Sequence, residues 1–200
     1  SLGTALGEGG LGLPPLLGTL MWVFSGIVNA VAPGNGADAQ AVEMRRFFDA
    51  SAVLMTVVLL LAVLAVVAAV GRRRRWDAAH LALSPVLLSS ALISYDLVTV
   101  LCIAAAFWAW SRSRVVAAGV FAGLAICARP LTALLLVAVL AACLRAGRVG
   151  HWARFAGVAT LVWGVVRFVL FSLPLGALGY DWQSWKASGP GYGSLWLVPR

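Results

Sequence analysis

The chain has 200 residues, of which 62% are hydrophobic and only 11% are charged, and its mean hydropathy is +0.96. A soluble domain has about 45–50% apolar and 25% charged residues, so a water-soluble globule of this composition could not cover its surface with polar groups. The net charge of +8 comes mostly from arginines in short runs between apolar stretches, a pattern typical of membrane topology signals, which argues against nucleic-acid binding.

The apolar stretches predict an all-α fold, a polytopic transmembrane helical bundle with the lipid bilayer as its solvent. We treat residues 1–200 as a single transmembrane domain and expect it to be a fragment of a longer protein, because it begins without an initiator Met or a signal peptide. The first stretch, residues 13–32, opens with a Pro-Pro pair that suits the first turn of a helix, which either spans the membrane or lies along its outer interface. Residues 50–70 carry no charge and reach the ~20 residues of a full crossing, so we expect a transmembrane helix there.

Residues 78–110 are predicted to form a transmembrane hairpin. Arginines flank this stretch at both ends, and short loops that carry arginine remain in the cytoplasm, so the chain must enter the membrane and return. A polar interruption near its middle marks the turn and places Tyr95 and Asp96 at the tip. The flanking arginines are Arg72–Arg75 before the stretch and Arg112 and Arg114 after it.

Residues 115–144 are predicted to form a second hairpin by the same reasoning. Pro130 removes a backbone donor and moves the preceding residue out of helical geometry, so the turn falls at Arg129. The hairpin arms have about 14–17 residues and cover only about 21–25 Å, so both tips should lie in a recess below the outer surface. The arginines beyond this stretch are Arg145, Arg148 and Arg154.

The last apolar stretch, residues 155–173, is predicted to be a transmembrane helix that carries Arg167, and residues 174–200 are predicted to form an extracytoplasmic aromatic loop. Nine of the fifteen basic residues then lie on the cytoplasmic side, which predicts a multi-pass protein of the plasma (inner) membrane.

Three charged side chains within the apolar stretches are candidate site residues. Asp96 either marks a ligand site, as ionisable groups at membrane depth generally do, or caps the following helix. Arg129 either binds a phosphate through its planar guanidinium or snorkels to the interface. Arg167 either faces the bundle, where it forms a structural ion pair or joins the phosphate site, or snorkels to the interface.

The polar and aromatic residues of the last loop either form an interfacial belt or a sugar-binding surface that combines ring stacking with hydrogen bonds. These residues are Asp181, Trp182, Trp185, Tyr192 and Trp196. We expect no metal and no cofactor, because no ligand spacing and no nucleotide-binding loop is present. The cysteines, Cys102, Cys127 and Cys143, have no pairing pattern and are interpreted as small buried hydrophobes.

Three motifs together resemble bacterial membrane glycosyltransferases of glycosyltransferase family 87. The family's "LSP…INWDLL…AWAR", "AGVLLGL…AKLYP" and "RGPDWGSLWY" stretches are similar to parts of this chain between Leu13 and Trp196. The matching residues are Ala82-Leu83-Ser84-Pro85, Ile93-Ser94-Tyr95-Asp96-Leu97, Ala109-Trp110-Ser111-Arg112, Ala118-Gly119-Val120, Ala128-Arg129-Pro130-Leu131 and Gly189–Trp196.

The resemblance implies a GT-C fold and transfer of a sugar, mannose in known members, from a polyprenyl-phosphate donor to a glycan or glycolipid acceptor at the extracytoplasmic face. Arg129 and Arg167 would hold the donor phosphate, while Tyr95, Asp96 and the aromatic loop would bind sugar or acceptor. The family's Asn-Trp-Asp is Ser94-Tyr95-Asp96 here, and its catalytic carboxylate has no match, so we expect the base upstream of residue 1. The alternative is half of a transporter or flippase, with Asp96 and Arg129 as gating or coupling residues.

Overall fold

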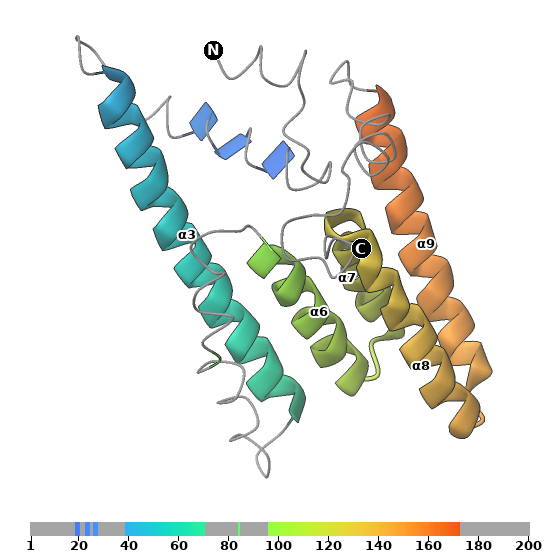
Figure 1. Cartoon of the computed structure of the whole chain (residues 1–200). Helices are drawn as coiled ribbons and strands as arrows, with labels where there is room; N and C mark the ends of the chain where they lie inside the picture. Colours follow the sequence, from blue (N-terminus) through green and yellow to red (C-terminus); the bar gives the residue numbers. More distant parts are fainter. Residues whose placement is uncertain are drawn as a thin grey trace, which may run out of the picture.

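The computed structural model describes residues 19–20, 23–24, 26–27, 39–70, 84 and 96–172, and it shows a bundle of helices (Figure 1). α3 and α9 lie on its two flanks, with α6, α7 and α8 between them. The predicted all-α membrane fold is confirmed. In chain order the elements are α3 (Ala39–Val70), α6 (Asp96–Ser111), α7 (Val115–Ala128), the 3₁₀ helix η2 (Pro130–Ala133), α8 (Leu134–Arg145) and α9 (Val149–Ser172).

Two of these helices are long and apolar enough to cross a membrane, over Arg45–Val70 and Val149–Val169. The inner helices are shorter, because α6 has 16 residues, α7 has 14 and α8 has 12. At ~1.5 Å per residue they cover about 24, 21 and 18 Å, less than the ~30 Å hydrocarbon core. Long outer helices therefore flank short inner ones. The first arm of the hairpin predicted over residues 78–110 lies outside the described residues, apart from residue 84.

α3 begins at Ala39, well before the apolar stretch that starts at Ala50. The intervening residues include exposed charged side chains such as Arg45 and Asp49, which suit a helix that continues beyond the lipid. No glycine or proline interrupts residues 39–70, so nothing in the backbone ends the helix at the polar boundary.

The first apolar stretch is described only at residues 19–20, 23–24 and 26–27, which are helical. Phe24 contacts Phe47 of α3 edge to face, with ring centroids 5.9 Å apart. This contact lies beside the polar beginning of α3, and whether residues 13–32 span the membrane stays a prediction.

The interior of the bundle consists of small side chains. α7 packs against α6 on one side and α9 on the other, and α3 packs against the opposite face of α6. Close approach of small residues is how helices associate within a bilayer, where lipid is as apolar as the core. Large apolar side chains instead cover the outer faces of α3 and α9, among them Val53, Leu60, Leu64, Leu161, Val165 and Phe168. The fully buried alanines are Ala62, Ala109, Ala118, Ala125, Ala128 and Ala159.

Gly119 and Gly123 fix how α7 meets α9. A Cβ on Gly119 would lie 2.8 Å from the Phe155 carbonyl oxygen, and a Cβ on Gly123 would lie 2.7 Å from that of Ala159. Both contacts advance by four residues, so the two helices run parallel. The sequence Gly119-x-x-x-Gly123 therefore forms the close-packing face between α7 and α9.

Because α7 and α9 run in the same direction, the chain must return between them, and η2 and α8 make that return. The turn from α6 to α7 and the turn from α8 to α9 consequently lie at the same end of the bundle (Figure 1). We call this the arginine end, since its turns carry Arg112, Arg114, Arg145 and Arg148.

Both turns at the arginine end close their preceding helix by the same hydrogen-bond pattern. The Arg114 N–H donates to the Ala109 carbonyl at 2.9 Å, and the Arg148 N–H donates to the Cys143 carbonyl at 2.9 Å. This Schellman arrangement requires one left-handed residue, which is Gly147 (φ 64°) after α8 but Ser113 (φ 60°) after α6.

We expect Gly123→Ala to destabilise the bundle by about 1–3 kcal/mol, because the new methyl group would overlap α9 backbone. Thermal unfolding of the purified protein in detergent would measure this loss. Gly157→Ala on α9 is the matched control, because its Cβ would meet nothing within 4 Å, and it should be neutral or stabilising. Equal losses for the two variants would contradict the parallel α7–α9 packing.

We expect Ser113→Gly to stabilise the protein and Gly147→Ser to destabilise it, each by about 1 kcal/mol in the free energy of unfolding. The unfolding temperature should rise for the first variant and fall for the second. A left-handed conformation is strained for a residue with a Cβ and unstrained for glycine. The same unfolding assay tests both variants. A shift of the unfolding temperature in the same direction for both would contradict the left-handed conformation of Ser113 and Gly147.

Candidate functional site

Asp96 and Arg129 meet through a bidentate ion pair at the end of the inner helices opposite the arginine turns. Arg129 Nε donates to Asp96 Oδ1 at 2.6 Å, and Arg129 Nη2 donates to Asp96 Oδ2 at 2.7 Å. These residues are 33 positions apart in the chain. The structure thus brings together the two side chains that the sequence placed at separate hairpin tips.

The backbone around Arg129 explains how the guanidinium reaches Asp96. α7 ends at Ala128, and Arg129 itself is extended, with φ −143° and ψ 110°. Pro130 then begins η2. The proline moves Arg129, the residue before it, out of helical geometry, so the turn falls at Arg129 as predicted. Thr132 closes the turn, since its N–H (3.0 Å) and its hydroxyl (2.7 Å) both donate to the Arg129 carbonyl.

Asp96 occupies the first turn of α6, where a negative charge interacts favourably with the helix dipole. The carboxylate therefore lies in the first turn of α6 and also orients Arg129.

Packing against α3 shows that this pair lies below the end of the apolar span. Leu97 belongs to one buried cluster with Met55 and Val58 of α3. Asp96 is thus close to the level of Met55, about five residues inside the charge-free part of α3 that begins at Ala50. At ~1.5 Å per residue this is about 8 Å along α3.

Packing against α9 gives the level of the ion pair on that helix. Gly119 lies against Phe155 and Val158, which are 36 and 39 positions further along the chain. The same offsets applied to Arg129 give the level of residues 165–168, and Arg167 falls within that interval.

Arg167 therefore lies at the level of the ion pair, on the neighbouring helix. Its guanidinium carbon is 6.0 Å from the centre of the Trp163 ring, and its Nη1 atom is buried. The buried Nη1 atom indicates that the Arg167 side chain turns toward the bundle.

Arg129 keeps donor capacity after pairing with Asp96. The pair uses two of the five guanidinium N–H groups and leaves the outer Nη1–Nη2 edge, which is a second fork of parallel donors. The hydrogen bond to Asp96 raises the pKa of Arg129 more than its partial burial lowers it, so the group stays charged. Both side chains are accessible, Arg129 at 46% and Asp96 at 40%.

Several predicted site residues lie outside the part of the chain that the structure describes: Tyr95, Asp181, Trp182, Trp185, Tyr192 and Trp196. Sequence reasoning missed two residues that support the site, Thr132 and Trp163. A threonine three residues after Arg129 and a tryptophan one turn before Arg167 were the available signals. Within residues 39–70 and 96–172, no group of three or more His, Cys, Asp or Glu side chains could hold a metal.

Comparison with known proteins gives one family. The sequence profile of glycosyltransferase family 87 matches residues 39–191, more than three quarters of the chain. No curated protein and no solved structure matches the chain in the same comparison. The matched range contains α3 through α9 and hence Asp96, Arg129 and Arg167.

We expect the Asp96–Arg129 pair to contribute little to stability, because accessible ion pairs are typically worth only 0.2–1 kcal/mol. A double-mutant cycle with Asp96→Asn and Arg129→Gln, read by thermal unfolding in detergent, should give a coupling energy below about 1 kcal/mol. A coupling of several kcal/mol would show instead that the pair holds the bundle together and would weaken its assignment as a site.

Proposed function

The chain belongs to glycosyltransferase family 87, and from this we propose that it transfers a hexose, mannose by its resemblance, from a polyprenyl-phosphate donor to a glycan or glycolipid of the cell envelope. The observation that carries the proposal is the recessed Asp96–Arg129 pair, which presents an oriented guanidinium to an anionic group. Its location would be the plasma membrane, crossed several times by a GT-C-like bundle.

The proposed orientation places the arginine end in the cytoplasm and the ion pair toward the extracytoplasmic side. Four arginines gather in the two turns at one end, and short loops rich in arginine stay cytoplasmic. The recess would then open away from the cytosol, toward the face where lipid-linked sugars are used in this type of chemistry.

Arg129 is proposed to bind the donor phosphate through its outer Nη1–Nη2 edge. Guanidinium and phosphate match in a bidentate geometry, and Asp96 holds the guanidinium plane fixed from the adjacent Nε–Nη2 edge. Arg167, at the same depth on α9, would provide a second positive charge. Two fixed cations suit a group whose negative charge increases when the bond to the sugar breaks.

The proposed reaction is an inverting displacement at the anomeric carbon. The acceptor hydroxyl oxygen forms the new bond, the bond from the anomeric carbon to the phosphate oxygen breaks, and the departing polyprenyl phosphate gains one negative charge near Arg129. A general base takes the hydroxyl proton. Asp96 does not suit that role, because Arg129 engages both of its oxygens, so we propose that Asp96 positions Arg129 and contacts the sugar.

The acceptor is proposed to bind at residues 174–200 together with Tyr95. Aromatic rings stack on sugar faces, and Asp181 and the indole N–H groups of Trp182 and Trp185 would add hydrogen bonds to hydroxyls. This part of the proposal derives from composition and from the family resemblance.

Arg129→Ala should reduce sugar transfer from a radiolabelled polyprenyl-phosphate hexose about 100- to 1,000-fold, the typical loss of a charge-stabilising donor. Arg129→Lys should recover no more than about tenfold of this loss, because an ammonium keeps the charge but not the fork. Turnover in membranes from cells expressing the full protein is the measurement.

Arg114→Lys, the same substitution at the arginine end, is the matched control and should transfer sugar normally. Unchanged turnover of Arg129→Ala would remove the phosphate role of Arg129. Vesicles that take up the sugar without transferring it would support the transporter alternative instead.

A further inference from the structure

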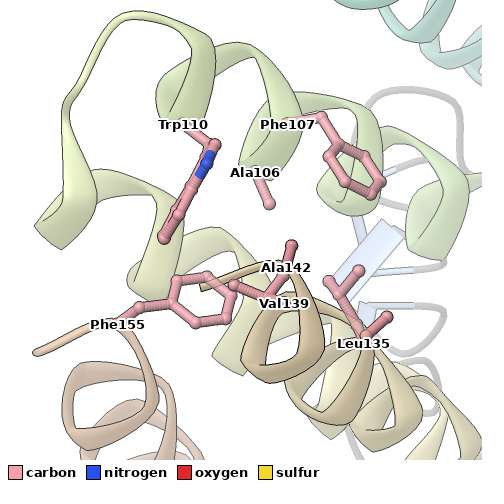
Figure 2. A pocket seen from close by; sticks show the side chains of 8 residues that line it. Ala106, Phe107, Trp110, Leu135, Val139, Ala142 and Phe155 are labelled. Carbon is pink, nitrogen blue, oxygen red and sulfur yellow. The ribbon is translucent and has the colours of Figure 1, made fainter. Parts of the chain in front are cut away.

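An apolar cavity opens between α6, α8 and α9 in the half of the bundle near the arginine end. Its volume is about 180 Å³, and it is open on one side. Figure 2 shows its lining, which includes Ala106, Phe107 and Trp110 of α6, Leu135 and Ala142 of α8, and Phe155 of α9. Apolar cavities of about 150 Å³ stay dry and accept a group the size of benzene, so this one suits a hydrocarbon ligand.

The cavity walls are held by specific contacts. Trp110 and Phe155 meet edge to face with ring centroids 5.3 Å apart, and Phe155 is the largest fully buried side chain among the described residues. The indole Nε1 of Trp152 donates to the Leu136 carbonyl at 3.0 Å and so attaches α8 to α9. Since side-chain contacts fix both helices, the cavity is a feature of the packed bundle.

The face of α8 that lines the cavity is followed by an exposed arginine. On α8 the lining residues are Leu135, Ala138, Val139 and Ala142, which follow the spacing of one helix face. The next position on that face is Arg145, three residues after Ala142, and its side chain is exposed. The other arginines of the two turns at this end, Arg112, Arg114 and Arg148, are exposed as well.

We propose that this cavity and the arginine end form a binding site for an anionic phospholipid of the adjacent leaflet. One acyl chain would enter the cavity, and the headgroup phosphate would bind Arg145 with the arginines of the neighbouring turn. Basic groups beside a pocket between membrane helices are the arrangement that recognises anionic headgroups. The charge of the arginines selects the headgroup, and the apolar lining accepts the chain.

This site is separate from the proposed donor site. Arg129 lies at the far end of α7, whose 14 residues span about 21 Å from the arginine end. A donor phosphate at Arg129 and a lipid phosphate at Arg145 would thus occupy opposite ends of the inner helices.

Native mass spectrometry of the purified protein would test the proposal by counting bound lipids after addition of phosphatidylglycerol or phosphatidylcholine with identical acyl chains. Phosphatidylglycerol should be retained preferentially. Arg145→Gln should reduce that preference about five-fold, because each arginine near the surface contributes an attraction of this size to anionic lipid. Arg45→Gln removes an exposed arginine from α3, away from the cavity, and should leave the preference unchanged.

Ala142→Phe should fill the cavity and reduce retention of both lipids. Ala141→Phe is the matched control, since it adds the same ring one position away on α8, where Ala141 is exposed and does not line the cavity. Equal retention by the two phenylalanine variants would overturn the proposal, and so would an unchanged headgroup preference in Arg145→Gln. Displacement of phosphatidylglycerol by a polyprenyl phosphate, with loss of both in Ala142→Phe, would reassign the cavity to the donor chain.

Discussion

The proposed chemistry depends on the bidentate contact between Asp96 and Arg129, which joins the beginning of α6 to the end of α7. The pair orients the guanidinium and leaves part of it available. Because α6 and α7 have only 16 and 14 residues, less than a full bilayer crossing, their ends meet level with Met55, about five residues inside the charge-free part of α3.

The inner and outer helices differ in the size of their side chains, and this difference also brings the ends of α6 and α7 together. Alanine and glycine in α6 and α7 permit close backbone approach, and the long apolar helices α3 and α9 on the flanks present large side chains toward lipid. The flanking helices also set the depth of the site. Leu97 packs against Met55 and Val58 of α3, and Gly123 packs against α9, and these two contacts place the ion pair level with Met55 and with Arg167.

The two ends of the bundle differ in electrostatic character, and each end carries one of the two proposed sites. At one end a single arginine is oriented by a carboxylate, which suits precise binding of one phosphate. At the other end several exposed arginines border an apolar cavity, which suits looser selection of lipids by charge. With the proposed lipid-linked donor, the chain would bind lipid phosphates at both ends of the inner helices.

The sequence by itself determined the fold class and the turn at Arg129, because apolar length and proline act locally and leave clear signals. Only the tertiary structure decided that Asp96 pairs with Arg129, that Arg167 lies level with them, and that a cavity faces the arginine end. These facts depend on how α7 meets α9 through its glycines and on side-chain contacts between residues far apart in the chain, which hydrophobic periodicity does not encode.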